Sequence, residues 1–413
     1  MIVVVKKKFK IKYILLAILS TAVTFGVLKQ NKIEETHIPV KEVSEISDSS
    51  DLDSWAAIIS NRLNDSLLSY GITGGAYAIV HNSEVLVKHV HGLQKQNTTD
   101  SINENTLFRL ASVSKTFTGI LASKLVEEGT INLDEKIIDI IPDFQLKDSV
   151  NTNTVTIRHI LSHTAGLVPH AYDNLLDHNV PVKQILPMLK DAEISAKPGV
   201  LYSYQNVMFS LFDTIVQVKT GKTYEQLVEE KIFQPLGMYT ASNSFKDFIE
   251  TNNYTYPHTR VKNGYAATRL NKRYYLPAAG VNASINDMAK YLLALTGYAP
   301  DKISQQVLDT CFKEQVVSPL RYHYLKYWDR KSVDTKHYAL GWRVIKYKNR
   351  KILYHGGYVR SYRAEIMVCP EEKLGFAFIS NAPSRFASQC VPIVLDDFIK
   401  QIDDSLYYAE TSF

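Results

Sequence analysis

The apolar runs typical of β-strands lie near the two ends of the chain, with a mostly helical stretch between them. Residues 75–82 and 84–92 form two such runs separated by Ser83, a pattern that predicts a β-hairpin. Further runs occur at residues 340–347, 351–356, 362–369 and 373–380. Short turns between neighbouring runs favour antiparallel pairing. The sequence therefore predicts an α+β fold, with one antiparallel sheet built from both ends of the chain and a large helical insertion.

Helical periodicity predicts most of the remaining elements. A helix over residues 55–71 precedes the hairpin, and another over residues 388–402 closes the chain. In the insertion we expect helices over residues 115–128, 182–191, 205–219, 224–233 and 285–295. Residues 239–276 are rich in tyrosine and asparagine and weakly periodic, so we expect long loops there.

These patterns predict one domain over residues 55–405. The sheet would come from residues 55–110 and 338–405, and the helices and loops of the insertion from residues 111–337. A polar, acidic stretch over residues 29–54 precedes the domain and is typical of a flexible tether.

The first 28 residues indicate export. Five lysines among the first twelve residues account for the whole net charge of +5, so the body is neutral and no nucleic-acid partner is expected. Residues 13–28 are apolar and uncharged, and such a run after a basic start is typical of a signal peptide or membrane anchor. No small-x-small pair ends the run, which favours an uncleaved anchor, and a buried core helix is the alternative. We expect an exported body in the periplasm or on the extracytoplasmic face, tethered to the inner membrane by residues 13–28.

A serine and a lysine stand three residues apart where a helical pattern begins. Ser112 and Lys115 form the only Ser-x-x-Lys in the chain, and this spacing places both side chains on one face of a helix. A serine hydroxyl becomes a good nucleophile when a base removes its proton. An amine buried in an apolar neighbourhood has a lowered pKa and can be that base. The alternative is a solvated lysine on an amphipathic helix.

The surrounding motifs strengthen the catalytic interpretation. In order, they are LFRLASVSKTFTG, VTIRHILSHTAGL, KPGVLYSYQNVMF, PLGM, AAGVNASINDMAKYL, YALGWRV and YHGGY. Together they closely resemble the serine β-lactamase and penicillin-binding protein superfamily, most of all its class C branch with its esterases and D-amino-acid peptidases. The resemblance runs from residue 55 to residue 402 and implies the three-layer α/β/α, β-lactamase/transpeptidase-like fold.

The resemblance assigns roles to particular residues. Ser112 resembles the acylated nucleophile, Lys115 its proton acceptor, and Tyr204 the tyrosine that relays the proton to the leaving group. Asn206 resembles the residue that hydrogen-bonds the substrate amide and steadies the lysine. Two other Tyr-x-Asn triplets begin at Tyr172 and at residue 347, but only Tyr204 follows a Lys-Pro-Gly turn and opens a predicted helix.

The motif His355 to Tyr358 stands where the family has Lys-Thr-Gly or a His-x-Gly variant. By resemblance, His355, Gly357 and Tyr358 would bind substrate, and the backbone amides of Ser112 and Tyr358 would form an oxyanion hole. His355 and Gly356 replace the lysine and threonine that hold a β-lactam carboxylate, so esters, amides or D-peptides are favoured over antibiotics. Downstream, either of two arginines could supply charge or pair with an acid on the sheet: Arg360 and Arg363.

Other kinds of site receive less support. His159 and His163 are four residues apart, as zinc ligands can be, but no HExxH glutamate accompanies them, and we expect neither a metal nor a cofactor. The segment containing them resembles a structural turn near the family's active site. The aromatic residues that could line a pocket, or pack under loops, are Tyr254, Tyr256, Tyr265, Tyr274 and Tyr275. The cysteines allow one disulfide whose pair the sequence does not select: Cys311, Cys369 and Cys390.

Two functions from different classes follow. The first is a monomeric, exported serine hydrolase that acts through an acyl-enzyme. Its substrate would be a small molecule or peptide with an ester, amide, D-peptide or β-lactam bond. A β-lactamase or D,D-carboxypeptidase proper is the narrower alternative within this class. The second is a catalytically degenerate protein that binds cell-wall peptide or a protein partner. The presence of Ser112, Lys115 and Tyr204 together favours the enzyme.

Overall fold

The computed structural model describes residues 49–270, 276–319 and 325–411. The predicted signal or anchor over residues 1–28 lies outside the described residues, as does the predicted tether up to residue 48. Within the described part, no helix has both the length and the apolar character needed to cross a bilayer.

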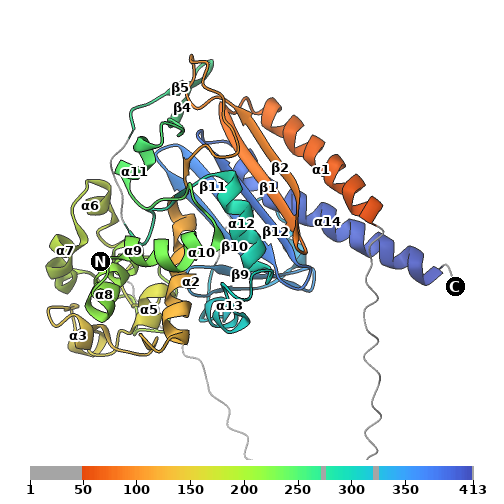
Figure 1. Ribbon diagram of the computed structural model, residues 1–413. Coiled ribbons are helices and arrows are strands. Elements are labelled where there is room, and N and C mark those ends of the chain that lie inside the picture. The colour runs from red at the N-terminus through yellow and green to blue at the C-terminus, as the bar shows by residue number, and fades with distance from the viewer. Residues whose placement is uncertain (1–48, 271–275, 320–324, 412–413) are drawn as a thin grey trace, which may run out of the picture. The chain divides into compact units, whose positions relative to one another are not determined.

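The described residues contain one antiparallel sheet of eight strands (Figure 1). In spatial order its strands are β2 (Glu84–Gly92), β1 (Gly74–His81), β12 (Leu374–Ser380), β11 (Tyr362–Cys369), β10 (Arg350–Val359), β9 (Arg343–Tyr347), β8 (Val333–Tyr338) and β7 (Val316–Val317). The N-terminal hairpin therefore joins the C-terminal strands through β1 and β12, with Ala78 opposite Ala377. The predicted fold class, a sheet built from both ends of the chain, is confirmed.

One face of the sheet packs against the helices of the insertion. Alternate residues of β1, Ala76 and Ala78, point into this core, as the two-residue period of a strand requires. The helices α2 (Ser114–Glu127) and α12 (Ile285–Leu295) contribute Phe117 and Tyr291, whose rings stack 4.0 Å apart. Further helices of this layer are α8 (Asn206–Thr220) and α13 (Gln305–Phe312). This is the layer in which Ser112 and Lys115 lie.

The two terminal helices cover the opposite face (Figure 1). They are α1 (Ser49–Ser69) and α14 (Phe386–Thr411). The other residues of β1, Tyr77 and Ile79, are buried there. Trp55 of α1 packs edge to face on Phe398 of α14, with ring centres 5.1 Å apart. Helices thus cover both faces, which explains why β1 is apolar along nearly its whole length.

Short elements fill the insertion. The helical ones are α3 (Ile137–Ile140), α4 (Ser149–Thr152), α5 (Ile157–Leu161), α6 (Asp173–Asp177), α7 (Val182–Ile185), η2 (Leu186–Asp191), α9 (Tyr224–Val228), η3 (Glu229–Phe233), α10 (Gln234–Leu236) and α11 (Phe245–Glu250). The helix expected over residues 182–191 is an α-turn followed by a 3₁₀ segment, and the one over residues 224–233 ends in a π-helical turn.

The loop prediction for residues 239–276 was incomplete. Besides α11, a small hairpin lies there, formed by β4 (His258–Val261) and β5 (Gly264–Ala267). Its two-residue turn is Lys262 and Asn263, and Gly264, which begins β5, has φ of +105°. Asn-Gly between short runs is a strong hairpin signal, so the sequence did carry the information.

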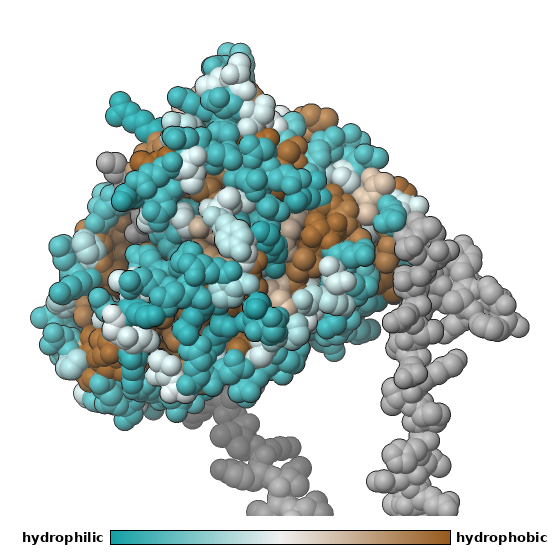
Figure 2. Space-filling view, viewed as in Figure 1, coloured by the Kyte–Doolittle hydropathy of each residue, from teal (hydrophilic) through white to brown (hydrophobic). Residues whose placement is uncertain are grey.

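The surface seen in Figure 2 is mainly hydrophilic, with apolar residues in separate patches. The three cysteines are buried and free, so the described residues contain no disulfide between them. Burial raises the pKa of each thiol, which keeps it in the protonated, unreactive form: Cys311, Cys369 and Cys390.

Candidate active site

Ser112 lies in the 3₁₀ turn η1 (Ala111–Val113), directly before α2. The turn follows the short strand β3 (Phe108–Arg109), which pairs with β6 (Asn282–Ala283). Ala111, the residue before the serine, has φ of +49°, a left-handed conformation that costs a non-glycine residue about 1–3 kcal/mol. Strain of this kind persists where the surrounding structure enforces it, and here it sets the direction in which Ser112 leaves the turn.

Lys115 lies one turn further along and is fully buried. Its Nζ atom donates to Asn206 Oδ1 at 2.7 Å and to the Ala278 carbonyl at 2.9 Å, and lies 3.3 Å from Ser112 Oγ. Burial lowers the pKa of this amine well below its usual value of 10.5; Asp173 partly opposes the shift. Such an environment favours the neutral amine, the form that can accept a proton.

Tyr204 approaches the same serine from the segment before α8. Its hydroxyl donates to Ser112 Oγ at 3.0 Å, and Lys115 Nζ lies 4.8 Å from the centre of its ring. Asn206, two residues later, begins α8 and contacts Lys115. Four predicted site residues from two distant segments of the chain therefore form one connected cluster: Ser112, Lys115, Tyr204 and Asn206.

The second half of β10 runs beside the serine. A Cβ atom built on Gly357 would lie 2.3 Å from the Leu110 carbonyl oxygen and 3.1 Å from the Ser112 amide nitrogen, so only glycine fits this approach. β10 pairs with β11 as far as Val359, but with β9 only as far as Tyr354. Among the described residues, β9 therefore does not pair with β10 beyond Tyr354, and this edge of β10 lies next to Ser112.

The remaining residues of the HGGY motif differ in exposure. His355 is fully buried; its Nε2 lies 3.2 Å from the Tyr338 hydroxyl and its Nδ1 3.0 Å from the Gly356 carbonyl. Burial lowers its pKa well below 6.5, so it does not supply the charge of the family's lysine. Tyr358 is 59% exposed. Substrate binding by His355, Gly357 and Tyr358 stays a prediction.

The two downstream arginines have different environments. Arg363 pairs with Glu365, a fully buried carboxylate that also accepts a hydrogen bond from the Tyr354 hydroxyl at 2.7 Å. Arg363 therefore forms an ion pair with an acid, which was one of the two alternatives expected. The acid, however, is buried and does not lie on the sheet surface. Arg360 is exposed in the tight turn between β10 and β11, with φ of +43°.

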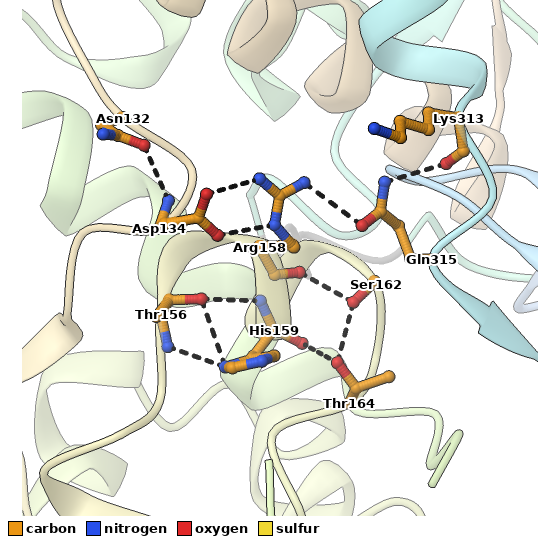
Figure 3. Close-up of polar contacts among 9 residues, drawn as sticks. All are labelled: Asn132, Asp134, Thr156, Arg158, His159, Ser162, Thr164, Lys313 and Gln315. Carbon is orange, nitrogen blue, oxygen red and sulfur yellow. Dashed lines mark hydrogen bonds and ion pairs between the residues drawn. The ribbon is translucent and has the colours of Figure 1, made fainter. Parts of the chain in front are cut away.

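His159 has a structural role in the turn shown in Figure 3. Its Nδ1 accepts from the Thr156 amide at 3.1 Å while Thr156 Oγ1 accepts from the His159 amide, a capping box at the start of α5. The neighbouring Arg158 is held by two bonds to Asp134, of 2.7 and 2.8 Å, and one of 3.2 Å to Gln315 near β7 (Figure 3).

Three residues that sequence reasoning did not place in the site lie close to it. His163 is buried, its ring centre is 4.2 Å from that of Tyr204, and its Nδ1 accepts from the Gln205 amide at 3.2 Å. Asp173 contacts Asn206, and His170 contacts Asp173. From the sequence alone, the triplet Tyr172 to Asn174 is only a competing Tyr-x-Asn motif. Its central residue, Asp173, is the one that contacts the site.

The tyrosine-rich segment forms a separate groove of about 400 Å³. Tyr254 and Tyr256 line it, with hydroxyl groups 3.3 Å apart. Its other lining residues are Gln94, Asp100, Ser101 and Asn252. Tyr265 packs in the core under α1 and α14, and Tyr274 and Tyr275 lie outside the described residues.

Comparison with known proteins identifies the family of the chain. The sequence model of the family described as Beta-lactamase matches residues 54–395. The chain belongs to the beta-lactamase family. The resemblance inferred from the sequence motifs is thereby confirmed, and the family's members are generally serine hydrolases.

Relatives of this beta-lactamase family protein include a fungal and a bacterial protein. Unguisins hydrolase ungD' of Aspergillus campestris is 28% identical over 84% of the chain, and Protein flp of Staphylococcus aureus is 23% identical over 78%. The chain spans only 64% and 62% of the lengths of these two proteins. The octameric penicillin-binding protein homologue from Pyrococcus abyssi matches with a TM-score of 0.70 and 22% identity, covering 82% of this chain and 77% of that one, which shows the shared fold.

Proposed function

We propose that this protein is a serine hydrolase that works through a covalent acyl-enzyme formed on Ser112. The observation that carries the proposal is the position of one hydroxyl between a buried amine and a phenol: Ser112 Oγ lies 3.3 Å from Lys115 Nζ and 3.0 Å from Tyr204 Oη. Nucleophile and base within hydrogen-bond reach, with the base oriented by a third group, is the arrangement that such catalysis needs. Asn206 is the orienting group, through its 2.7 Å contact with Lys115.

The reaction proceeds in two steps, acylation of Ser112 and hydrolysis of the acyl-enzyme. Neutral Lys115 takes the proton of Ser112 as Oγ bonds to the substrate carbonyl carbon, and the scissile bond breaks when the leaving group receives a proton through Tyr204. Water then attacks the ester carbonyl and gives a proton to the base, and that proton passes to Ser112 Oγ as its bond to the acyl carbon breaks, which releases the acid and restores the serine. The backbone amides of Ser112 and Tyr358 would hold the carbonyl oxygen during both steps.

The substrate is an ester, amide or D-peptide in preference to a β-lactam. His355 is buried, with a lowered pKa, and Gly356 has no side chain, so neither position offers a cation or a hydroxyl to a β-lactam carboxylate. Arg363 is bound to Glu365 and does not replace that charge. The fungal relative, Unguisins hydrolase ungD', is named as a hydrolase, which agrees with hydrolytic chemistry. Export by residues 13–28 belongs to the same proposal and rests on the sequence alone.

Active-site labelling tests the proposal. The full chain is treated with a fluorophosphonate probe, and the labelled peptide is identified by mass spectrometry. We expect one adduct on Ser112 and its loss in Ser112→Ala. An adduct that persists in Ser112→Ala would overturn the assignment of the nucleophile. A wild-type protein that takes no label and hydrolyses no p-nitrophenyl ester would favour the second candidate, a binding protein without turnover.

A further inference from the structure

We propose that Asp173 is a positioning residue that fixes the carboxamide of Asn206 with its oxygen toward Lys115. The inference rests on the proposed function, because the orientation matters only if Lys115 acts as a base. Asp173 begins α6, in a segment that neither the sequence motifs nor the family comparison had assigned a role.

The hydrogen bonds of Asn206 define its orientation. Its Nδ2 donates to Asp173 Oδ2 at 2.7 Å, and its backbone amide donates to Asp173 Oδ1 at 3.2 Å. An ionised carboxylate only accepts hydrogen bonds, so it selects the nitrogen of the carboxamide and directs the oxygen the other way. That oxygen receives the 2.7 Å bond from Lys115 Nζ. A rotated carboxamide would point its oxygen at a carboxylate and its N–H groups at the amine.

The segment that carries Asp173 is itself tied to the site. His170 Nδ1 lies 2.7 Å from Asp173 Oδ2, and the His170 backbone amide donates to the Tyr204 carbonyl at 2.8 Å. His170 and Tyr172 both have left-handed backbones, with φ of +61° and +58°. Two such residues in three are costly unless contacts enforce them, and here they bring Asp173 against the start of α8.

The charge of Asp173 also acts on Lys115. The Asp173 side chain is only 15% exposed, so water screens it little. Its negative charge raises the pKa of Lys115 against the effect of burial, whereas Arg343 lowers it. The other groups that face the amine are Tyr204 and two buried histidines with lowered pKa values: His163 and His355. Removing the carboxylate should therefore move the deprotonation of Lys115 to lower pH.

The test compares Asp173→Asn with Asp177→Asn, an exposed aspartate on the same short helix. The rate of fluorophosphonate labelling at Ser112 is measured from acid to alkaline pH in the full chain. In Asp173→Asn we expect a rate lower by about tenfold to a hundredfold, the usual effect of a hydrogen bond to a charged group. We also expect the acid limb of the pH profile to shift to lower pH. Asp177→Asn should match the wild type.

A second pair of variants separates geometry from charge. Asp173→Glu keeps the charge but displaces Asn206, so the rate should fall while the acid limb stays in place. Asp173→Asn combined with Asn206→Asp again sets a donor against an acceptor but brings the carboxylate into contact with Lys115, so the acid limb should move to higher pH than in Asp173→Asn. Circular dichroism shows whether each variant is folded.

Each result decides between the two proposals. Labelling of Asp173→Asn at the wild-type rate and with an unmoved acid limb would overturn the role of Asp173 while leaving the hydrolase intact. If Asp173→Asn does not fold, an unchanged rate in Asp173→Glu would overturn it in the same way. A wild-type protein without label on Ser112 would overturn the proposed function itself.

Discussion

At the scale of single residues, the amine of Lys115 is fully buried, which carries a large free-energy cost of desolvation. A lysine removed from water loses hydration that the protein must replace, and here two oxygens accept its hydrogen bonds: Asn206 Oδ1 and the Ala278 carbonyl. Burial still lowers its pKa. The same burial that costs folding energy therefore provides a base that is neutral at lower pH than an exposed lysine.

We expect the labelling rate of Ser112 to rise with pH along an acid limb that lies below 10.5. The sign follows from the neutral amine being the active form and from burial lowering its pKa. Lys115→Met keeps most of the buried stem and removes the base, so the rate should fall by about a hundredfold to ten-thousandfold. Lys124→Met, near the end of the same helix, is the matched control. Loss of the circular dichroism spectrum in Lys115→Met would show that the amine is needed for folding.

The residues that surround the Ser112 hydroxyl could be predicted from the sequence, but the residues that contact and position them could not. Ser112, Lys115 and Tyr204 belong to short motifs whose spacing reports helix faces and turns. Asp173 and His163 reach the site through loops with left-handed residues, and neither spacing nor periodicity describes such paths. Contacts of that kind become visible only when the chain is folded.

At the scale of elements, the important contact is that of β10 with the turn that carries Ser112. Gly357 allows the strand to approach the Leu110 carbonyl and the Ser112 amide closely. The strands over residues 340–380 were predictable because their apolar runs are buried on both faces. β8 escaped prediction because its side chains are largely polar and partly exposed near the sheet edge, and β7 because it has only two residues.

Gly357→Ala should separate β10 from Ser112. The added Cβ would lie 2.3 Å from the Leu110 oxygen, so the strand must shift and the expected oxyanion hole must widen. Loss of one oxyanion donor costs about 3 kcal/mol of transition-state stabilisation, which corresponds to a rate of p-nitrophenyl ester hydrolysis lower by more than a hundredfold. Lys351→Ala, at the other end of β10, should leave the rate unchanged. Equal rates in Gly357→Ala and the wild type would contradict this role of the strand.

At the scale of the whole domain, the sheet separates two cores with different duties. The core on the α2 side surrounds the candidate site, whereas the core under α1 and α14 contains no predicted catalytic residue. Trp55 belongs to the second core: it is 3% exposed, and its Nε1 donates to Asp397 Oδ1 at 3.0 Å. Stability and catalysis should therefore respond to different substitutions.

Trp55→Ala should lower the free energy of unfolding by about 3–5 kcal/mol, the usual cost of truncating a buried tryptophan. Urea denaturation followed by circular dichroism measures the change. Ile58→Ala, 63% exposed on the same helix, should change stability by less than about 0.5 kcal/mol. Under conditions where both variants are folded, Ser112 should label at the wild-type rate. A large loss of labelling in folded Trp55→Ala would show that the two cores are coupled.

The pairing of Ala78 with Ala377 has a consequence for how the protein is made. During synthesis from the N-terminus, the hairpin β1–β2 emerges early, and the edge of β1 opposite β2 has no partner strand until residues 374–380 have left the ribosome. Pairings between such distant segments form slowly, because closing the long loop between them costs chain entropy before the strand contacts can offset that cost. Assembly of the sheet is thus delayed until the chain is nearly finished, and a shortened chain that ends before residue 374 would leave β1 with an uncovered edge.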